Sequence, residues 1–540
     1  MSIGKAPDVR CPALTDPRPR DTSAPAQSRG LLRTGALVGG LTFVSRILGL
    51  ARDVVIAVLF GARPEADAFF VAFRIPNLFR RLFAEGAFSQ GFIPVLAAYR
   101  QAQSHAEVRR FVGRVAGVLG LVLLLLTLIG ILAAPLVIGV FAPGFEGSGG
   151  RHDLASEMLR ITFPYLFLIS LTALCAGVLN SYNRFAVPAI TPVWLNLCLI
   201  AAALGLAGRL EEPIMALAWG VLVAGVVQFL FQLPALARID MLVRPRLEPR
   251  DPGVRRVVTL MLPAAFGASV SQINLLIDTV LASFLVAGSI SWLYYADRLM
   301  ELPLGIFAIA LATVLLPRLS REHAEGSPEV FSATLDQGMR LGLLVTVPAA
   351  AALVVLAEPL IATLFHYGAM GAEDVRQAAF ALKAYALGLI GFTGVKILAP
   401  GFFARQDTRT PVRIALWAMA VNLVLNLALI LPLAHVGLAL ATSVAALVNA
   451  LLLLRGLRSE GVWRPAPEWR GFLLRLGGAT AAMVALLWFV APPAETWLAA
   501  DVARRVIWMA FLVPAGVAAY FIVLALAGLG PKRLLRTFLH

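Results

Sequence analysis

The sequence predicts an all-α protein that crosses a membrane about fourteen times. Three observations support this fold class. The 540 residues are 59% apolar and only 14% charged, whereas soluble proteins carry about 25% charged residues. Apolar windows long enough to span a bilayer recur along the chain. Basic residues gather in every second loop, as the positive-inside rule requires of a polytopic membrane protein.

The apolar windows set the expected helices, each about 20 residues or longer. In chain order they cover 32–60, 67–97, 111–141, 156–181, 186–208, 213–237, 257–287, 289–317, 338–365, 376–404, 411–433, 436–455, 471–491 and 504–529. A faint repeat is present, because residues 80–100 resemble 297–321 and residues 183–200 resemble 404–430. Many transporters contain such repeats. We therefore expect two six-helix lobes, 31–240 and 251–458, followed by a helix pair at 467–530.

The loop charges orient these helices. The loops predicted to be cytoplasmic contain Arg100, Arg109, Arg110, Arg184, Arg238, Arg244, Arg246, Arg250, Arg255, Arg256, Arg318, Arg321, Arg405, Arg409, Arg455, Arg458 and Arg464. The opposite loops carry only Arg63, Arg151, Arg209, Arg504 and Arg505. Both termini are therefore predicted to be cytoplasmic. Residues 1–30, polar and rich in Pro and Arg, are expected to form a disordered cytoplasmic tail, and residues 531–540 a second tail.

Composition also excludes several classes of function. The cytoplasmic loops account for most of the net charge of +15, so a nucleic-acid partner is not indicated. Cys11, Cys175 and Cys198 have no metal-binding or redox spacing. The chain also lacks the Gly-rich phosphate-binding loop of an ATPase. We therefore expect a transporter rather than an enzyme, without a cofactor, driven by an ion gradient, the membrane potential or the substrate's own gradient.

Charged residues inside the apolar windows indicate a functional cavity. Residues 42–100 hold Arg46, Arg52, Asp53, Asp67, Arg74, Arg80, Arg81 and Glu85. Each such group costs roughly 2.5–3.5 kcal/mol at the bilayer centre and is found facing water, a charged partner or a ligand. Five arginines against three acids predict a cationic cavity for an anionic substrate. The alternative, that the arginines are anchors reaching the membrane surface, suits Arg81 and Arg100 best.

Helical spacing refines this set. Arg46 and Asp53 are seven residues apart and share a face, whereas Arg46 and Arg52 lie about 120° apart around the helix. Asp67 and Arg74 are also seven residues apart.

Two neighbouring arginines follow a kink in the second helix. Pro76 produces the kink, which leaves both Arg80 and Arg81 as candidates for the cavity. Arg81 and Glu85 are four residues apart and can neutralise each other. That pairing would leave Arg80 the freer cation.

The second lobe supplies Asp297, Arg298 and Glu301 within one helix, on neighbouring faces. Either they form a structural ion pair, or the acids hold Arg298 until a conformational change releases it. Arginine suits phosphate, because its planar guanidinium binds two oxygens at once and stays charged when partly desolvated. Arginines that converge from two lobes therefore favour a diphosphate-containing substrate.

A candidate cation site lies elsewhere in the second lobe. Asp278 lies mid-helix, and Thr442 lies in a later helix. Asn422 and Asn426 are four residues apart on one helical face. Carboxylate, amide and hydroxyl oxygens are ligands for a hard cation such as Na⁺. Ordinary hydrogen bonding between helices is the alternative.

Two long motifs carry a resemblance to a known family. SRILGLARD at 45–53 is followed by FGARPEADAFFVAFRIPNLFRRLFAEGAFSQGFIPVL at 60–96, and SWLYYADRLMELPLGIF occupies 291–307. These motifs closely resemble the lipid II flippase family called MurJ or MviN, and the hydropathy pattern agrees over residues 31–530. The resemblance implies the multidrug/oligosaccharidyl-lipid/polysaccharide exporter (MOP) fold, in which the last two helices form a groove for the lipid tail.

The resemblance also implies a function and a site. It implies alternating access that moves lipid II, a lipid-linked disaccharide-pentapeptide, from the cytoplasmic to the periplasmic leaflet of the bacterial inner membrane for peptidoglycan synthesis. The family's cavity residues fall on Arg46, Arg52, Asp67, Arg74, Arg80 and Arg298. The supporting residues of the expected site are Ser45, Asp53, Arg81, Glu85, Asp297 and Glu301.

The sodium ligands of some family members would fall on Asp278, Asn422, Asn426 and Thr442. Asn426 stands where those members have an acid, which weakens the case for sodium coupling and leaves the membrane potential as another energy source. The expected partners are lipid II, membrane lipids and the cell-wall synthesis machinery. The alternatives are an exporter of another lipid-linked oligosaccharide, a drug or cation antiporter of the same fold, and a non-transporting scaffold for cell-wall enzymes. An antiporter would need an acidic or apolar cavity and no appended helix pair, which is the reverse of this sequence.

Overall fold

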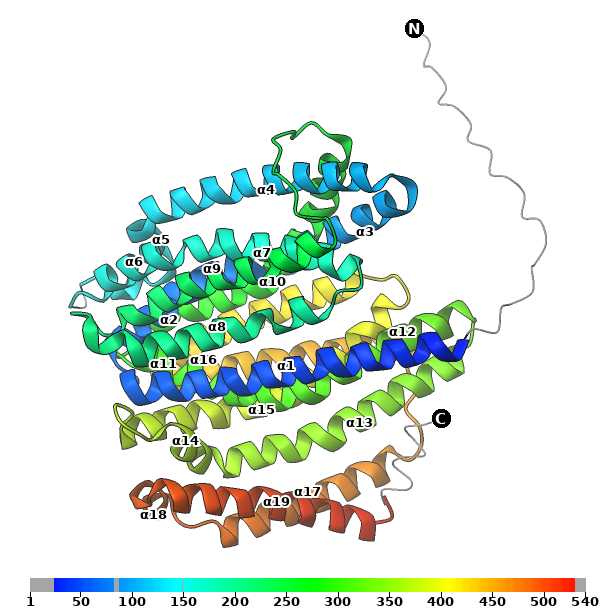
Figure 1. Cartoon of the computed structure of the whole chain (residues 1–540). Helices are drawn as coiled ribbons and strands as arrows, with labels where there is room; N and C mark the ends of the chain where they lie inside the picture. The colour runs from blue at the N-terminus through cyan, green and yellow to red at the C-terminus, as the bar shows by residue number, and fades with distance from the viewer. Residues whose placement is uncertain (1–23, 82–86, 148, 530–540) are drawn as a thin grey trace.

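The structure, a computed structural model, describes residues 24–81, 87–147 and 149–529. Within these residues the regular secondary structure is entirely helical. The helices lie side by side in one elongated bundle, with their axes in nearly the same direction, and the loops gather at its two ends (Figure 1). Large apolar side chains face outward, such as Leu132 at 82% and Phe489 at 85% exposure. The predicted all-α membrane fold is therefore confirmed.

The first half of the chain forms a group of helices that we call the N-half. It contains α1 (Ala24–Phe60), α2 (Pro64–Arg80), α3 (Ala87–Ala102), α4 (His105–Leu132), α5 (Ala134–Phe141), α6 (Arg151–Thr162), α7 (Pro164–Ser181), α8 (Ala186–Gly205) and α9 (Met215–Arg238). α8 and α7 pack on α9, α1 packs on α8, and α2 packs on α6.

The next group is called the C-half. It contains α10 (Pro252–Ser283), α11 (Ser289–Pro303), the π-helical turn η4 (Leu304–Ala308), α12 (Ile309–Ala324), α13 (Pro328–Val355), α14 (Ala357–Phe365), α15 (Ala372–Phe403) and α16 (Arg409–Ser459). α15 is central to this group and packs against α11, α13 and α16. The two halves meet where α3 packs on α10 and α2 packs on α11.

The final helices form the appended pair. They are α17 (Trp469–Val490) and α19 (Val502–Leu526), joined by the short α18 (Ala494–Ala499). α17 packs on α13, and α19 packs on α14.

Prolines explain why several predicted windows contain two helices. Pro135 and Pro164 lie in the first turns of α5 and α7, directly after the breaks from α4 and α6. Proline lacks a backbone N–H, so it is tolerated in a first turn but interrupts a helix interior. The window 289–317 is interrupted in the same way, because η4 follows Pro303.

The long helix α16 breaks at Ala434, whose φ of 48° and ψ of −129° are not helical. Asn422 Nδ2 donates to Thr442 Oγ1 at 3.4 Å across the break, so its two parts form a hairpin. The break falls between the predicted windows 411–433 and 436–455. In the described part of the chain, nine helical segments are long and apolar enough to cross a membrane. The total of fourteen crossings stays a prediction.

The chain ends differ from expectation in one respect. α1 begins at Ala24, so residues 24–30, which were expected in the tail, are helical. Residues 1–23 and 530–540, which include the rest of both expected tails, lie outside the described residues.

The loops divide between the two ends of the bundle as the charge pattern predicts. The loops 182–185, 239–251 and 404–408, which contain Arg184, Arg244, Arg246, Arg250 and Arg405, lie at one end, which we call the basic end (Figure 1). The loops 61–63, 284–288 and 366–371 lie at the opposite end, which we call the far end. That the basic end is cytoplasmic stays a prediction.

Arg505 of α19 ties the appended pair to the C-half near the far end. The residue is buried, with 5% exposure. It donates to the carbonyls of Ala362 at 3.3 Å and His366 at 3.0 Å, at the C-terminus of α14. It also donates to the carbonyls of Trp497 at 3.0 Å and Leu498 at 2.7 Å in α18. A cation is favourable at helix C-termini because their carbonyls carry partial negative charge.

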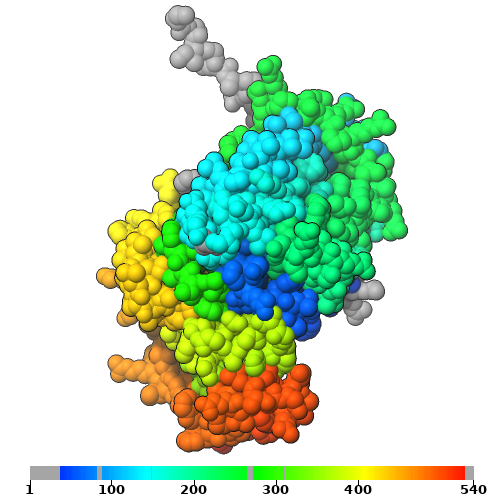
Figure 2. All heavy atoms as spheres, turned by 90° about the vertical axis from the view of Figure 1, so that its left-hand side faces the viewer, coloured from blue at the N-terminus to red at the C-terminus, as the bar shows by residue number. Residues whose placement is uncertain are grey.

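Further contacts run along α13. Tyr520 of α19 donates to the carbonyl of Leu344 at 2.7 Å. Near the basic end, Trp469 Nε1 donates to Asp336 Oδ1 at 2.5 Å. Figure 2 shows the far end of the bundle, where the appended pair, in orange and red, lies against the yellow-green segment of α13 and α14 and apart from the cyan N-half. The appended pair is thus attached to the C-half alone at this end.

We predict that Arg505→Leu weakens this attachment, because four carbonyls lose their hydrogen bonds to a charged donor, each worth about 1.5–3 kcal/mol. The melting temperature of the purified protein should fall by several degrees, and proteolysis in the linker 460–468 should become faster. Arg504→Leu is the matched control, because that neighbouring arginine has a side chain 71% exposed. Equal melting temperatures for the two variants would contradict the assignment.

Candidate functional site

A cavity of about 400 Å³ lies between the N-half and the C-half. Its lining comes from α1, α2, α8, α10 and α11. The charged and polar lining residues are Ser45, Arg46, Arg52, Arg74, Asn77, Arg80, Arg81, Asn196, Gln272, Tyr294, Asp297, Arg298 and Glu301. Six arginines against two acids make this cavity cationic. We call it the arginine cavity.

Asp53 connects the two halves beside this cavity. Its carboxylate is fully buried, and Oδ1 accepts from Arg52 Nε at 2.9 Å and Nη2 at 2.6 Å. Oδ2 accepts from Arg298 Nε at 2.7 Å, across the boundary between halves. Tyr294 donates to Oδ1 at 2.8 Å and accepts from Arg52 Nη2 at 2.9 Å. Asp53 thus bridges an arginine of α1 and an arginine of α11. Helical spacing had placed Asp53 only on the same face of α1 as Arg46.

Two glycines allow the arginines to cross between α1 and the α11–η4 segment. A Cβ added to Gly49 of α1 would lie 2.7 Å from Arg298 Nη2. A Cβ added to Gly305 of η4 would lie 1.9 Å from Arg46 Nη1. Each guanidinium therefore lies against the backbone of the opposite half, in space that any other residue type would fill.

The arginines of α2 complete the cavity wall. Arg74 Nη1 donates to Thr279 Oγ1 of α10 at 2.8 Å, which adds a second link between halves. Arg80 Nε donates to the neutral amide oxygen Oδ1 of Asn77 at 2.7 Å, and the expectation that Arg80 is the freer cation stays a prediction. Arg81 also lines the cavity. Glu85, its expected partner, lies outside the described residues.

The two acids of α11, Asp297 and Glu301, both line the arginine cavity. Glu301 Oε2 lies 3.4 Å from Arg298 Nη1, within the same helix. Arg298 is therefore shared between Asp53 of the N-half and Glu301 of its own helix.

Asp67 does not line the cavity, although the sequence placed it in the substrate-binding set. Its carboxylate is 1% exposed and lies at the N-terminus of α11. Oδ2 accepts from the Gly288 backbone at 2.7 Å, and Oδ1 accepts from the Ser291 backbone at 2.9 Å and its hydroxyl at 2.6 Å. The first N–H groups of a helix have no partner within the helix and favour an anion. Asp67 of α2 therefore caps α11 across the boundary between halves.

Other contacts close the far end of the bundle next to this cap. The Ala369 backbone donates to the Val58 carbonyl at 2.8 Å. Tyr295 donates to the Gly61 carbonyl at 3.2 Å. Gly61, with φ of 64°, lets the chain turn where a Cβ would lie 2.5 Å from the Ala369 carbonyl oxygen. Figure 2 shows these segments, in blue and yellow-green, in contact at this end.

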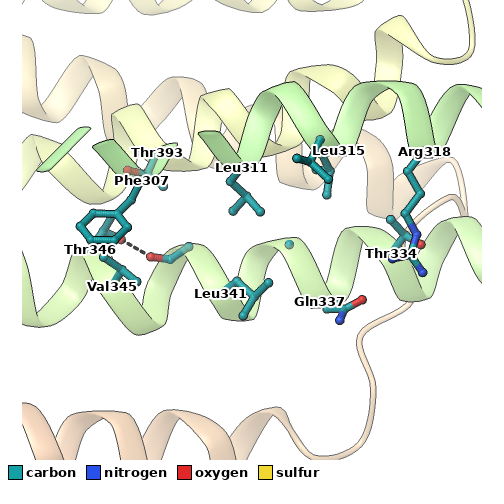
Figure 3. Close-up of a pocket in the computed structure, with 13 residues that line it drawn as sticks. Phe307, Leu311, Leu315, Arg318, Thr334, Gln337, Leu341, Val345, Thr346 and Thr393 are labelled. Carbon is teal, nitrogen blue, oxygen red and sulfur yellow. Dashed lines mark hydrogen bonds between the residues drawn. The ribbon is translucent and has the colours of Figure 1, made fainter. Parts of the chain in front are cut away.

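An apolar cavity of about 430 Å³ lies in the C-half, between α12 and α13, with η4 and α15 contributing. Figure 3 shows Phe307 at one end, Leu311, Leu315 and Leu341 along the middle, and Arg318 with Thr334 at the other end. Phe307 is two residues from Gly305, against which Arg46 lies. The η4 turn thus contacts an arginine of the arginine cavity through Gly305 and forms part of this apolar cavity through Phe307.

The candidate cation ligands lie together in the C-half. Asn426 Nδ2 donates to Asp278 Oδ1 at 2.7 Å and to Asn422 Oδ1 at 3.0 Å. Thr442 Oγ1 donates to Asp278 Oδ2 at 3.4 Å. The geometry is that of an interhelical hydrogen-bond network. The donor set of one carboxylate, two amide oxygens and a hydroxyl would fit Na⁺ once the Asn426 amide turned, because its Oδ1 is buried and has no hydrogen-bond partner among the described residues.

Several residues of the site escaped the sequence analysis. Asn196 accepts from Arg52 at 3.2 Å, and Thr279 accepts from Arg74. Neither is charged or lies in a distinctive pattern. Tyr294 and Ser291 could have been found, because both lie in the motif SWLYYADR that precedes Leu299.

A bundle of membrane-spanning helices with an arginine-lined cavity between its halves is typical of a multi-pass membrane transporter. The sequence identifies the family within this class. The family model described as "Lipid II flippase MurJ" matches residues 56–507, and the chain belongs to this family.

Individual relatives agree with this assignment. A "Probable lipid II flippase MurJ" of Vibrio cholerae is 47% identical, over 94% of this chain and 98% of the relative. A "Lipid II flippase MurJ" of Burkholderia cenocepacia is 44% identical, over 92% and 98%. The solved structure "Lipid II flippase MurJ, inward closed conformation" is 27% identical with a TM-score of 0.75, over 90% of this chain and 98% of that one. An inward-facing multidrug transporter of the MATE family, 16% identical with a TM-score of 0.64 over 79% of this chain and 98% of that one, shares the fold.

We predict that Asp53→Asn destabilises the protein by about 3–5 kcal/mol, because it leaves the buried guanidinium of Arg52 without its counter-ion and takes from Arg298 one of the two acids that it contacts. Thermal unfolding of the purified protein measures this loss. Glu157→Gln, at an exposed acid of α6, is the control. The double variant Asp53→Asn/Arg298→Gln should lose less than the sum of the two single changes. Additive losses would show that Asp53 does not couple to Arg298.

Proposed function

We propose that this protein moves lipid II, the undecaprenyl-diphosphate-linked peptidoglycan precursor, from the cytoplasmic to the periplasmic leaflet of the inner membrane by alternating access. The observation that supports this most is the arginine cavity, lined by six arginines from both halves of a chain of the MurJ family. We take the basic end and both termini to be cytoplasmic, as the loop charges predict.

The arginines would bind the diphosphate. Phosphate oxygens accept two parallel hydrogen bonds from one guanidinium, and such charge-assisted bonds are about twice as strong as neutral ones. Arg52 and Arg298 already share the carboxylate of Asp53. A diphosphate that replaced this carboxylate as their shared anion would join the two halves through the substrate. Arg46, Arg74 and Arg80 would then neutralise the remaining charge, and Asp297 and Glu301 would keep the arginines apart when no substrate is bound.

Asp67 has a different role in this proposal. Its three hydrogen bonds to Gly288 and Ser291 hold α2 against α11 at the far end. Alternating access requires the far end to open, so these bonds must break in each cycle. In this proposal Asp67 holds the far end closed, and the arginine cavity binds the substrate.

The lipid tail needs an apolar path outside the arginine cavity. We propose that the undecaprenyl chain lies along the C-half, between the arginine cavity and the groove expected at the appended pair, 467–530. The apolar cavity between α12 and α13 supports this path, because η4, which lies against Arg46, contributes Phe307 to its lining, and α13, which forms one of its walls, packs against α17. Energy would come from the membrane potential or an ion gradient, with Asp278, Asn422, Asn426 and Thr442 as the ligands if the ion is Na⁺.

The alternative functions differ from lipid II transport in the cavity lining that they require. A drug or cation antiporter needs acids or apolar walls where this cavity has arginines. Another lipid-linked oligosaccharide with a diphosphate would fit the same arginines, and native mass spectrometry with both lipids separates the two substrates. A scaffold for cell-wall enzymes would function without the cavity arginines.

We predict that Arg52→Ala and Arg298→Ala insert normally in the membrane but lose most lipid II flipping, because each removes a bidentate phosphate ligand worth about 1.5–3 kcal/mol. The measurement is the accessibility of lipid II at the periplasmic face of cells that depend on the variant. Arg475→Ala is the control, because it removes an exposed arginine of α17 far from the cavity. Accessibility at the level of the unmodified protein in either cavity variant would refute the proposal.

We also predict that Asp67→Ala opens the far end, because α11 loses the cap that joins it to α2. With a cysteine introduced in place of the cavity residue Ser45, labelling by a membrane-impermeant maleimide from the periplasm should increase in the Asp67→Ala background. Asp153→Asn, at an acid whose side chain is 94% exposed, should leave labelling unchanged. Unchanged labelling in Asp67→Ala would show that Asp67 does not hold the far end closed.

A further inference from the structure

A second apolar cavity, of about 600 Å³, lies in the N-half and takes no part in the proposed transport cycle. Its walls come from α4, α7 and α9, and the loop 241–247 forms its edge. The deep wall contains buried Leu174 and Val178, whereas Leu121 and Leu124 on α4 are 43% and 45% exposed. We call this cavity the α4 groove. Its volume is within the range of about 300–1,000 Å³ that is usual for small-molecule sites.

The loop that edges the α4 groove is held in a defined position on α4. The Arg246 backbone donates to the Gly113 carbonyl at 2.9 Å. A Cβ on Gly117 would lie 2.1 Å from the Arg246 carbonyl oxygen, and a Cβ on Gly113 would lie 2.8 Å from that of Arg244. Two glycines of α4 therefore provide the surface on which this loop lies. Figure 1 shows the loop at the outer edge of the bundle, over α4.

The position along α4 corresponds to a membrane surface. α4 is polar up to Arg114 and has no charged residue from Val115 to Leu132. Gly113 and Gly117, which hold the loop, lie at this change of composition. Leu242 and Leu247 of the loop are 51% and 63% exposed. Arginine beside exposed leucine suits the boundary between headgroups and acyl chains, where long basic side chains reach the aqueous phase.

The acids and the arginines of the segment 238–256 differ in number and in their ion-pair partners. Its acids Asp240, Glu248 and Asp251 form ion pairs with arginines of α4, namely Arg109 for the first and Arg114 for the other two. Its basic residues are Arg238, Arg244, Arg246, Arg250, Arg255 and Arg256. In the described part of the chain, none of these six side chains forms an ion pair with an acid. The mouth of the α4 groove thus carries a concentration of uncompensated positive charge.

We propose that the α4 groove binds one phospholipid with an anionic headgroup from the cytoplasmic leaflet. An acyl chain would lie in the apolar groove between α4, α7 and α9. The headgroup phosphate would lie at the loop, within reach of Arg244 and Arg246. An apolar groove between membrane helices with arginines at its cytoplasmic mouth provides both interactions that such a lipid needs. The site is separate from the arginine cavity, so the inference goes beyond the proposed function and does not depend on the lipid transported.

Native mass spectrometry of the full-length protein in detergent tests this site. Phosphatidylglycerol and phosphatidylethanolamine with the same acyl chains are added in turn. We expect one phosphatidylglycerol to be retained in preference to phosphatidylethanolamine. Arg244→Ala/Arg246→Ala should weaken the binding of phosphatidylglycerol about thirtyfold, because each surface arginine contributes about 1 kcal/mol to the binding of an anionic lipid and about 1.4 kcal/mol corresponds to a factor of ten. The control is Arg321→Ala/Arg458→Ala, which removes two arginines from the basic end of the C-half.

A second variant tests the groove without disturbing the fold. Gly120 lines the α4 groove, and a Cβ added there meets no atom within 4 Å, so Gly120→Leu fills the groove. It should lower phosphatidylglycerol retention as the double arginine variant does. Gly477→Leu, at an equally open glycine of α17, should not. Equal retention of the two phospholipids, or retention unchanged by both groove variants, would overturn the proposal. Arg298→Ala should leave retention unchanged, which separates failure at this site from failure at the arginine cavity.

Discussion

The carboxylate of Asp53, shared by Arg52 of α1 and Arg298 of α11, is the interaction on which the rest of the central structure depends. Two guanidinium groups that face each other in a buried site repel unless an anion lies between them. With that anion, the N-half and the C-half can approach closely enough to enclose a cavity. The same arrangement presents two cations side by side to any anion that competes with the carboxylate.

This arrangement also needs space, which the backbone provides. Gly49 and Gly305 have no side chains, so Arg298 and Arg46 can each lie against the helix of the opposite half. The contacts are reciprocal, because each segment contributes one arginine and one glycine. Polar contacts at the boundary between halves therefore lie beside apolar ones, such as the stacking of Phe70 of α2 on Tyr294 of α11 at 4.0 Å between ring centroids.

The sequence analysis predicted much of this architecture but few of its contacts. Window length and loop charge located the helices, and the rarity of charge in apolar windows pointed to the arginines that line the cavity. Helical spacing, however, reports only neighbours on one helix. It placed Asp53 with Arg46, whereas the partner from the other half, Arg298, lies 245 residues away. The family resemblance, and not helical spacing, assigned Asp67 to substrate binding, which stays a prediction, and spacing gave no sign that its carboxylate caps α11. Both outcomes depend on how two helices pack, which periodicity does not encode.

The hydrogen bonds of Asp67 determine how closure of the far end depends on the salt concentration outside the cell. All of its bonds run to neutral donors, namely two backbone N–H groups and one hydroxyl. Dissolved salt screens attraction between exposed charges over about 10 Å at 0.1 M, but it has little effect on short hydrogen bonds inside a buried contact. The far end can therefore stay closed across wide changes in external ionic strength, whereas a closure made from surface ion pairs would loosen as salinity rose.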